Sequence, residues 1–409
     1  MAYRTFVTPR SILYGPGALE GLSTAPGKRA LIVTDPGVRA LGLVEKVEKI
    51  LADKGAATAV YDQVEPDPSR ETAWAVFAQA QTFKPDLFVG LGGGSSMDAG
   101  KVAWLLYENP ELAERPFLEF IGQVPRQELR KKARYVAIPT TSGTGSEVTA
   151  AAVVTDRSVD PPFKAGFGSR ELVPDMAIAD PELTLSMPPE VTANTGLDAL
   201  VHATECYVLS TPSDLVDSLA LWSARTIQEW LPRAVDNGED IQARDKMHLA
   251  SLQAGMAFTN GRLGLVHGAA HEIGGTFGVP HGRANAFMLC PVFAFLYSGY
   301  RLRLSSLASY LGVSGQDDHA KVYNLLDALD RLKERVGIPR AIKDSGLDEA
   351  LFMSRVGAIS EAYIGRMERS PVIRDMTAEE RRSRGIPATS DEMKELFMHA
   401  WNGTRPELT

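Results

Sequence analysis

Hydrophobic positions in the first half of the chain alternate between short continuous runs and helical spacing. The continuous runs, which predict buried strands, are residues 30–34, 59–61, 86–91 and 135–138. Apolar side chains three and four positions apart, which predict amphipathic helices, occur in residues 44–54, 71–83 and 97–107. Strands that alternate with helices predict a parallel sheet covered by helices on both faces.

After Pro188 the pattern changes to long amphipathic stretches, and strand signals nearly vanish. These stretches are residues 191–209, 215–230, 243–257, 320–336 and 391–401. We therefore expect two domains: an α/β, Rossmann-like domain over residues 1–183 and an all-helical domain over residues 184–409. Residues 366–387 are dense in charge, which predicts a solvated surface loop.

Composition narrows the class of protein without identifying a substrate. A chain of 409 residues with 44% hydrophobic and 23% charged residues can form a full core. The net charge of -8 and the lack of a long basic cluster predict that nucleic acid is not a partner. The two cysteines form no CxxC motif, and the N-terminus lacks a signal-peptide core, so we expect a cytoplasmic protein. No apolar run approaches the roughly 20 residues that a membrane-spanning helix needs, so no membrane partner is expected.

A glycine-rich loop, Gly90-Leu91-Gly92-Gly93-Gly94-Ser95-Ser96, follows the third predicted strand. Glycines let the backbone approach a ligand closely, and the amides at the start of the next helix favour an anion such as phosphate. Because Ser95 occupies the sixth position, the loop departs from the usual G-x-G-x-x-G. The alternative interpretation is a plain strand-to-helix turn.

A second loop, Pro139-Thr140-Thr141-Ser142-Gly143-Thr144-Gly145-Ser146-Glu147, follows the fourth predicted strand and is rich in hydroxyls. Two such loops after parallel strands are expected to meet at the carboxyl edge of the sheet, where ligands bind in open α/β folds. Together they predict a nucleotide site. The segment Gly15-Pro16-Gly17-Ala18-Leu19-Glu20-Gly21 resembles a dinucleotide fingerprint, but Pro16 and a weak preceding strand favour a structural turn.

Asp35 closes the first predicted strand. A carboxylate in that place can bond a ribose hydroxyl and would repel a 2′-phosphate, which favours NAD over NADP. The alternative is an aspartate that caps a helix or a turn.

Histidine and aspartate residues gather in two segments. Asp198 and His202 lie four residues apart in a helical stretch, so their side chains share a helix face and can point at one ion. His267, His271 and His281 fall close together among glycines. Imidazole and carboxylate suit iron, zinc or another borderline divalent metal. A site open to substrate needs about three or four protein ligands. The spacing does not decide which of His267 and His271 is not a metal ligand.

These motifs, in this order, resemble those of the iron-containing (group III) alcohol dehydrogenase family over nearly the whole chain. The matching segments are Gly92-Gly93-Gly94-Ser95 with Asp98 and Lys101, residues 139–149, 180–184, Asp198 with His202, residues 267–271 and residues 280–286. The resemblance implies the dehydroquinate synthase-like fold, with a dinucleotide domain, a helical metal domain and an active site in the cleft between them. It also implies a homodimer or a higher homo-oligomer.

The resemblance further implies roles for individual residues. The implied metal ligands, for Fe²⁺ or alternatively Zn²⁺, are Asp198, His202, His267 and His281. His271 matches a non-ligand histidine beside the nicotinamide and is the candidate catalytic proton relay. Gly93, Gly94, Ser95 and Asp98 match the pyrophosphate site. The other implied cofactor-binding residues are Gly92 and, in the neighbouring loop, Thr140, Thr141 and Thr144. Leu183 would lie near the nicotinamide, Asp35 and Lys164 near the ribose, and Phe258 in the wall of the substrate pocket.

The activity that the resemblance implies is hydride transfer between NAD(H) and a small primary alcohol, diol or aldehyde. One alternative is a zinc-dependent polyol dehydrogenase or a dehydroquinate synthase-like enzyme on the same fold. The synthase would need several basic residues for an anionic substrate, and the sequence near the metal motifs offers only Arg262 and Arg283. Another is a non-catalytic nucleotide-binding protein, which would be expected to lose metal ligands. Gly278, where many relatives carry another histidine, and residues 374–384, an expanded loop, leave the substrate open.

Overall fold

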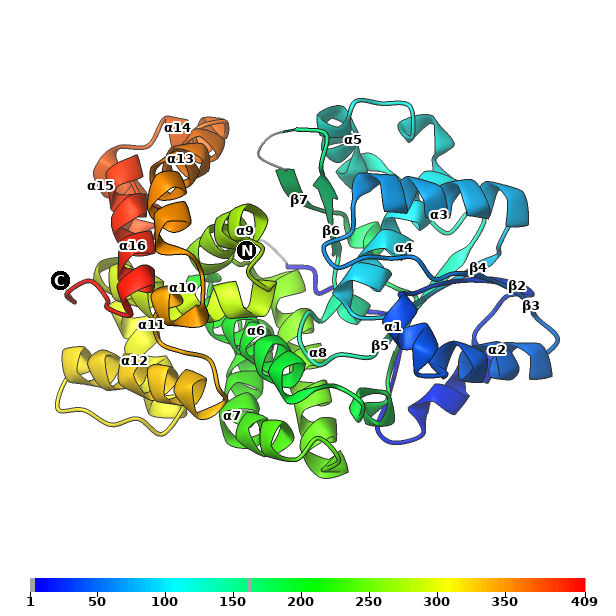
Figure 1. The fold of residues 1–409 in the computed structure, drawn as a ribbon, viewed down its shortest axis with the longest axis horizontal. Helices are drawn as coiled ribbons and strands as arrows, with labels where there is room; N and C mark the ends of the chain where they lie inside the picture. Colours follow the sequence, from blue (N-terminus) through cyan, green and yellow to red (C-terminus); the bar gives the residue numbers. More distant parts are fainter. Residues whose placement is uncertain (1–3, 160–162, 409) are drawn as a thin grey trace. The chain divides into compact units, whose positions relative to one another are not determined.

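The computed structural model describes residues 4–159 and 163–408, which fold as two compact units (Figure 1). The first unit contains the described residues up to Pro188 together with residues 237–260, and the second contains residues 189–236 and the chain after Asn260. The backbone therefore passes from one unit to the other three times. None of the helices in the described residues is long and apolar enough to cross a membrane.

The first unit is built on a six-stranded, all-parallel sheet in the order β1-β8-β5-β4-β2-β3. Its strands are β1 (Ser11–Tyr14), β2 (Arg29–Val33), β3 (Ala57–Tyr61), β4 (Leu87–Gly92), β5 (Arg134–Pro139) and β8 (Met176–Ala179). The four strands predicted from apolar runs are confirmed within two residues at each end. The two strands that the sequence did not clearly predict, β1 and β8, are four residues long.

Helices cover both faces of this sheet, as Figure 1 shows. They are α1 (Pro36–Ala40), α2 (Leu43–Asp53), α3 (Arg70–Phe83), α4 (Gly94–Glu108) and α5 (Phe117–Gln123). Along β2, Ala30 and Ile32 enter one core while Leu31 and Val33 enter the other. Because successive side chains of a strand point to opposite faces, a strand covered on both sides must be apolar throughout. That requirement explains why these strands could be recognised from continuous runs.

Further elements complete the first unit. An antiparallel hairpin joins β6 (Ala151–Asp156) to β7 (Phe163–Gly168). Short 3-10 helices include η1 (Ala18–Thr24), η4 (Ser146–Val148) and η6 (Pro181–Thr184). The glycine segment that begins at Gly15 forms the turn between β1 and η1, and both Gly15 and Gly17 have positive φ angles there.

The helix α8 (Ile241–Asn260) lies in the first unit, although the domain boundaries expected from the sequence, 1–183 and 184–409, place it in the second. Its Leu252 packs with Val148, Ala177 and Ala179 of the first unit. A Cβ atom added to Gly255 would lie only 2.9 Å from the Cα of Gly145. Amphipathic spacing shows that a helix has a buried face, but it does not show which core that face enters. The boundary between the two units falls after Pro188, five residues later than the expected boundary after residue 183.

The described residues of the second unit form helices and connecting loops, with no strand. Its helices are α6 (Pro189–Leu209), α7 (Asp214–Asp236), α9 (Leu265–Phe277), α10 (His281–Phe295), α11 (Tyr297–Tyr310), α12 (Asp318–Arg335), α13 (Glu349–Met367), α14 (Pro371–Arg374), α15 (Ala378–Ser383) and α16 (Ser390–Asn402). Nearly all residues of α6 from Thr192 onward are buried. A helix buried on all sides is normally apolar all round, so the polar side chains that α6 buries require partners.

The charged segment 366–387 is mostly exposed, as expected, but it is not a plain loop. It contains α14 and α15, and Thr377 and Glu380 form a capping box at the start of α15. Arg381 is buried and bonds Glu368 at 3.2 Å. Charge density alone does not reveal such a cap, which explains why the loop interpretation was wrong here.

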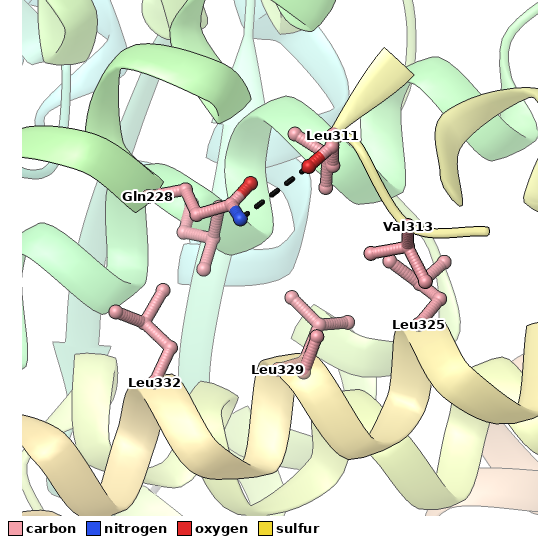
Figure 2. A pocket seen from close by; sticks show the side chains of 8 residues that line it. Gln228, Leu311, Val313, Leu325, Leu329 and Leu332 are labelled. Carbon is pink, nitrogen blue, oxygen red and sulfur yellow. Dashed lines mark hydrogen bonds between the residues drawn. The ribbon is translucent and has the colours of Figure 1, made fainter. Parts of the chain in front are cut away.

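A cavity within the second unit is lined mainly by leucines of α6 and α12 and by Gln228 of α7 (Figure 2). The Gln228 amide donates to the Leu311 carbonyl at 3.5 Å, and the cavity volume is about 10 Å³. That volume is near the minimum for a single water molecule. The cavity is therefore a packing gap, too small for an alcohol substrate.

Candidate functional site

The glycine-rich loop makes the transition from β4 to α4. Gly92 has a φ of +143°, in the region that favours glycine, and Gly93 caps α4 without a side-chain hydrogen bond. A Cβ atom added to Gly94 would lie 2.7 Å from Cγ2 of Thr144. The first amides of α4 are thus open to a bound anion, and larger residues would not fit the loop.

The hydroxyl-rich loop lies against the glycine-rich loop, as the sequence predicted. The amide of Thr140 donates to the Gly92 carbonyl at 3.0 Å, because β4 and β5 are neighbours in register up to Gly92 and Pro139. Thr141 lies 3.6 Å from where a Cβ of Gly93 would stand. The prediction that the two loops meet at the carboxyl edge of the sheet is confirmed.

Asp35 stands at the end of β2, next to the glycine-rich loop. Its Oδ1 accepts the Val38 amide at 3.0 Å, so it caps α1, and its Oδ2 accepts the Ser96 hydroxyl at 3.2 Å. The capping role weighed as the alternative is therefore present. From β2 the chain runs to β3 at one edge of the sheet, whereas from β4 it runs toward the other edge. Asp35 and the glycine-rich loop thus flank the topological switch point, where α/β folds bind ligands.

Asp98 and Lys101 on α4 hold the hydroxyl-rich loop and β6 in place. Asp98 accepts the Ser146 hydroxyl at 2.6 Å and the Val153 amide at 2.9 Å. Lys101 is buried and donates to the carbonyls of Thr149 and Ala151 at 3.0 and 2.9 Å. Burial lowers the pKa of Lys101 to about 8. Asp98 therefore has a clear structural role, and its contact with pyrophosphate stays a prediction.

The remaining predicted cofactor residues are spread over the first unit. Ser95 is half-buried in the first turn of α4. Lys164 on β7 pairs with Asp67 at 2.5 Å. Leu183 on η6 is buried in the core on the α2 face of the sheet. Phe258 lies half-buried on α8. Their roles toward nicotinamide, ribose and substrate stay predictions.

The predicted metal ligands gather in the second unit. Asp198, His267 and His281 each offer a ligand atom, and these atoms lie within 4.8 Å of one another. The ring of His202 stacks on that of His267 at a centroid distance of 4.7 Å. The fourth histidine, His271, has its ring 5.1 Å from that of His281. The structure thus brings five residues from three helices together, and their roles as ligands or relay stay predictions.

Close packing of α10 on α6 brings His281 to Asp198. A Cβ atom added to Gly282 would stand 2.0 Å from the Asn194 carbonyl oxygen and 3.1 Å from Cβ of Asp198. Only a glycine next to His281 permits this approach, which leaves His281 Nε2 3.7 Å from Asp198 Oδ1.

Two residues that the sequence analysis missed bond the candidate ligands. Glu205, fully buried on α6, accepts the His267 Nδ1 hydrogen bond at 2.6 Å. Asn285, buried on α10, donates to Asp198 at 2.7 Å. Glu205 follows His202 by three residues and Asn285 follows His281 by four, so helical spacing could have found both.

The donor set fits a borderline divalent metal, which prefers imidazole and carboxylate. The clearest sign is His267 itself. Its Nδ1 bonds Glu205, while its buried Nε2 has no hydrogen-bond partner among the described residues. A buried nitrogen is costly to leave without a partner, and a metal ligated by Asp198, His267 and His281 would satisfy it.

His248, which is not among the predicted site residues, yields a prediction about pH. It lies buried on α8 with Nδ1 2.9 Å from the Ser142 hydroxyl, and burial lowers its pKa to about 4. The unfolded chain binds a proton near the ordinary pKa of about 6.5, whereas the folded protein does not until near pH 4. His248 therefore destabilises the fold as pH falls through this window, by on the order of 3 kcal/mol.

The matched variant is His248→Asn, which keeps a polar atom near Nδ1 but does not titrate. Urea unfolding from about pH 7.5 to about pH 4.5 should show wild type losing stability relative to the variant as pH falls. Glu147, whose pKa burial raises to about 7, contributes with the opposite sign but equally in both proteins. Parallel stability profiles for the two proteins would contradict the prediction.

Comparison with known proteins covers both units. Residues 9–181 match the family model described as iron-containing alcohol dehydrogenase, and residues 192–395 match its C-terminal counterpart, described as Fe-containing alcohol dehydrogenase family, C-terminal. The chain is 37% identical over 404 residues to the NADPH-dependent butanol dehydrogenase of Clostridium saccharobutylicum, covering 98% of this chain and 99% of that protein.

Two further comparisons agree. The 1-propanol dehydrogenase PduQ of Salmonella typhimurium is 35% identical over 402 residues, covering 96% of this chain and 98% of that protein. The crystal structure of a 1,3-propanediol oxidoreductase superposes with a TM-score of 0.84 at 30% identity, covering 98% of this chain and 100% of that one.

Proposed function

The chain belongs to the iron-containing alcohol dehydrogenase family and is an alcohol oxidoreductase, and from that premise we propose that it transfers hydride between NAD(H) and small primary alcohols or aldehydes with a divalent metal. The observation that carries the proposal is the grouping of Asp198, His267 and His281 within 4.8 Å. With His202 beside them, these residues would hold Fe²⁺ or, alternatively, Zn²⁺. When bound, the metal would polarise the alcohol oxygen and the nicotinamide would exchange the hydride.

The first unit supports the nucleotide part of the proposal. The uncapped start of α4 and the hydroxyls of Thr140, Thr141 and Thr144 would bind the pyrophosphate. Asp35, at the switch point, favours NAD because its carboxylate would repel a 2′-phosphate. Since a relative carries the name NADPH-dependent butanol dehydrogenase, the choice of cofactor is tested separately below.

His271 is the candidate proton relay. It is half-buried on α9, with its ring 5.1 Å from that of His281. An imidazole titrates near neutral pH, so a histidine outside the ligand set can take the alcohol proton directly or through a water.

For the substrate, we propose alcohols or diols of about two to four carbons, in keeping with the butanol, propanol and propanediol in the names of its relatives. A zinc-dependent polyol dehydrogenase is the second candidate, because the same donor set suits zinc. A homo-oligomer is a further, separate proposal that light scattering of the purified protein would test.

The test begins with anaerobic purification and elemental analysis, followed by activity with added Fe²⁺ or Zn²⁺. Absorbance at about 340 nm then follows NAD or NADP with short alcohols, diols, polyols and the matching aldehydes. We expect metal-dependent turnover with short primary alcohols and a preference for NAD. Turnover that persists in metal-free protein would contradict the metal proposal, a preference for NADP would contradict the role of Asp35, and activity on polyols alone would favour the second candidate.

A further inference from the structure

Glu205 is a carboxylate buried completely inside the second unit, at 0% exposure. Its two oxygens accept two hydrogen bonds, one from the His267 ring and one from the backbone amide of Val266. We propose that Glu205 is a positioning residue that orients His267 and tightens metal binding. This inference rests on the proposed function, because it assumes that His267 ligates a metal.

The first argument concerns the proton on His267. The distance from Nδ1 to Oε2 of Glu205 is 2.6 Å. When Nε2 of His267 binds a metal, the ring carries its hydrogen on Nδ1, and Oε2 of Glu205 is the acceptor placed to receive that hydrogen bond. In the neutral ring, Nε2 then has the free lone pair that a metal needs. Glu205 therefore selects the tautomer in which His267 can act as a ligand through Nε2.

The second argument concerns the backbone that carries His267. Oε1 of Glu205 accepts the Val266 amide at 2.6 Å, and the cap residue of α9, Gly264, has no side chain to bond the first turn. Glu205 therefore satisfies an amide that a helix start would otherwise leave without a partner. The same carboxylate holds both the ring and the helix turn on which it is mounted, so the ring can neither rotate nor shift easily.

The third argument concerns charge. Asp198 and Glu205 are both buried, and the imidazoles that ligate a metal are neutral. A divalent cation ligated by Asp198 and His267 would lie close to both carboxylates and offset their negative charge. Buried charges are costly without such compensation. Loss of the Glu205 charge would weaken the attraction for the cation even if the hydrogen-bond geometry survived.

The test measures Co²⁺ binding to metal-free protein by visible absorbance, without any assay of turnover. We expect Glu205→Gln to weaken Co²⁺ affinity by about 10- to 100-fold, the usual effect of losing a partner behind a metal ligand, and to alter the visible spectrum. The control is Thr204→Val, which removes a buried hydroxyl bonded within α6 to the Leu200 carbonyl. That variant should bind Co²⁺ within about twofold of wild type, since the lost bond does not reach a ligand.

Wild-type affinity and an unchanged spectrum in Glu205→Gln would overturn the proposal, as would equal losses in Glu205→Gln and Thr204→Val. If Glu205→Gln does not fold, as judged by circular dichroism, Glu205→Asp replaces it. That variant keeps the charge but shortens the reach to His267, so it should bind less tightly than wild type, and equal affinity would again reject the role. Failure of wild type itself to bind Co²⁺ would contradict the proposed function, which separates the two conclusions.

Discussion

Replacing His267 by alanine is expected to abolish metal binding and alcohol dehydrogenase activity together. The substitution removes one of three residues whose ligand atoms lie within 4.8 Å of one another. It also leaves the buried carboxylate of Glu205 without its ring partner, which adds an uncompensated charge to the site. We expect metal content near zero by elemental analysis and activity reduced by about 1,000-fold or more, equivalent to roughly 4 kcal/mol in the barrier.

The matched control is His271→Ala, on the same helix one turn later. This variant is expected to keep its metal but to turn over about 100-fold more slowly, in the range of lost proton-transfer catalysis. The two results together would distinguish His267 as a metal ligand from His271 as a proton relay. If His271→Ala loses the metal while His267→Ala retains it, the two roles are reversed.

Gly282→Ala is expected to damage the metal site without removing any ligand. The new methyl would stand 2.0 Å from the Asn194 carbonyl oxygen, which belongs to the α6 backbone and has no flexible side chain to move aside. Helices α6 and α10 must therefore separate, carrying Asp198 and His281 apart. We expect Co²⁺ affinity to fall at least about tenfold, and the free energy of unfolding of the metal-free protein to fall by about 3 kcal/mol in urea titrations.

Gly275→Ala, on α9, provides the control for this substitution. A Cβ atom added to Gly275 would meet nothing within 4 Å. Alanine favours a helix more than glycine does, so this variant should gain up to about 1 kcal/mol and keep its Co²⁺ affinity. Equal behaviour of the two variants would show that the contact between α6 and α10 does not hold the ligands together.

Sequence patterns predicted most strands and helices of the first unit, because the burial of each element is recorded in its own residues. The strand around Leu31 and the helix around Val47 could be recognised from their own residues, since burial on both faces leaves a continuous apolar run and burial on one face leaves helical spacing. The edge strand β1 left a weak trace because it spans four residues, none fully buried. Membership of α8 in the first unit depends on contacts with residues far earlier in the chain, from Gly145 to Ala179, and no local pattern records them.

The candidate site, too, was predicted only where local spacing was sufficient. Spacing grouped Asp198 with His202, since they share one turn of α6, but it could not separate His267 from His271. The two histidines also stand four apart on one helix, so only a distant contact distinguishes them. That contact comes from Glu205, 62 positions before His267. Helical spacing places Glu205 close to the face of His202, but a glutamate in a helix is usually exposed, so its burial and its bond to His267 became apparent only from the fold.

Because α8 is synthesised after α6 and α7, the core of the first unit cannot be completed until part of the second unit has been translated. A ribosome releases residues 1–188 well before residues 237–260, so the nascent first unit lacks one of its own helices while α6 and α7 are still emerging. Until then Val148, Ala177 and Ala179 lack the leucine that covers them in the finished fold. The cores of both units thus depend on chain made after residue 240, and a single cut in the gene cannot yield a complete first unit without α6 and α7 of the second.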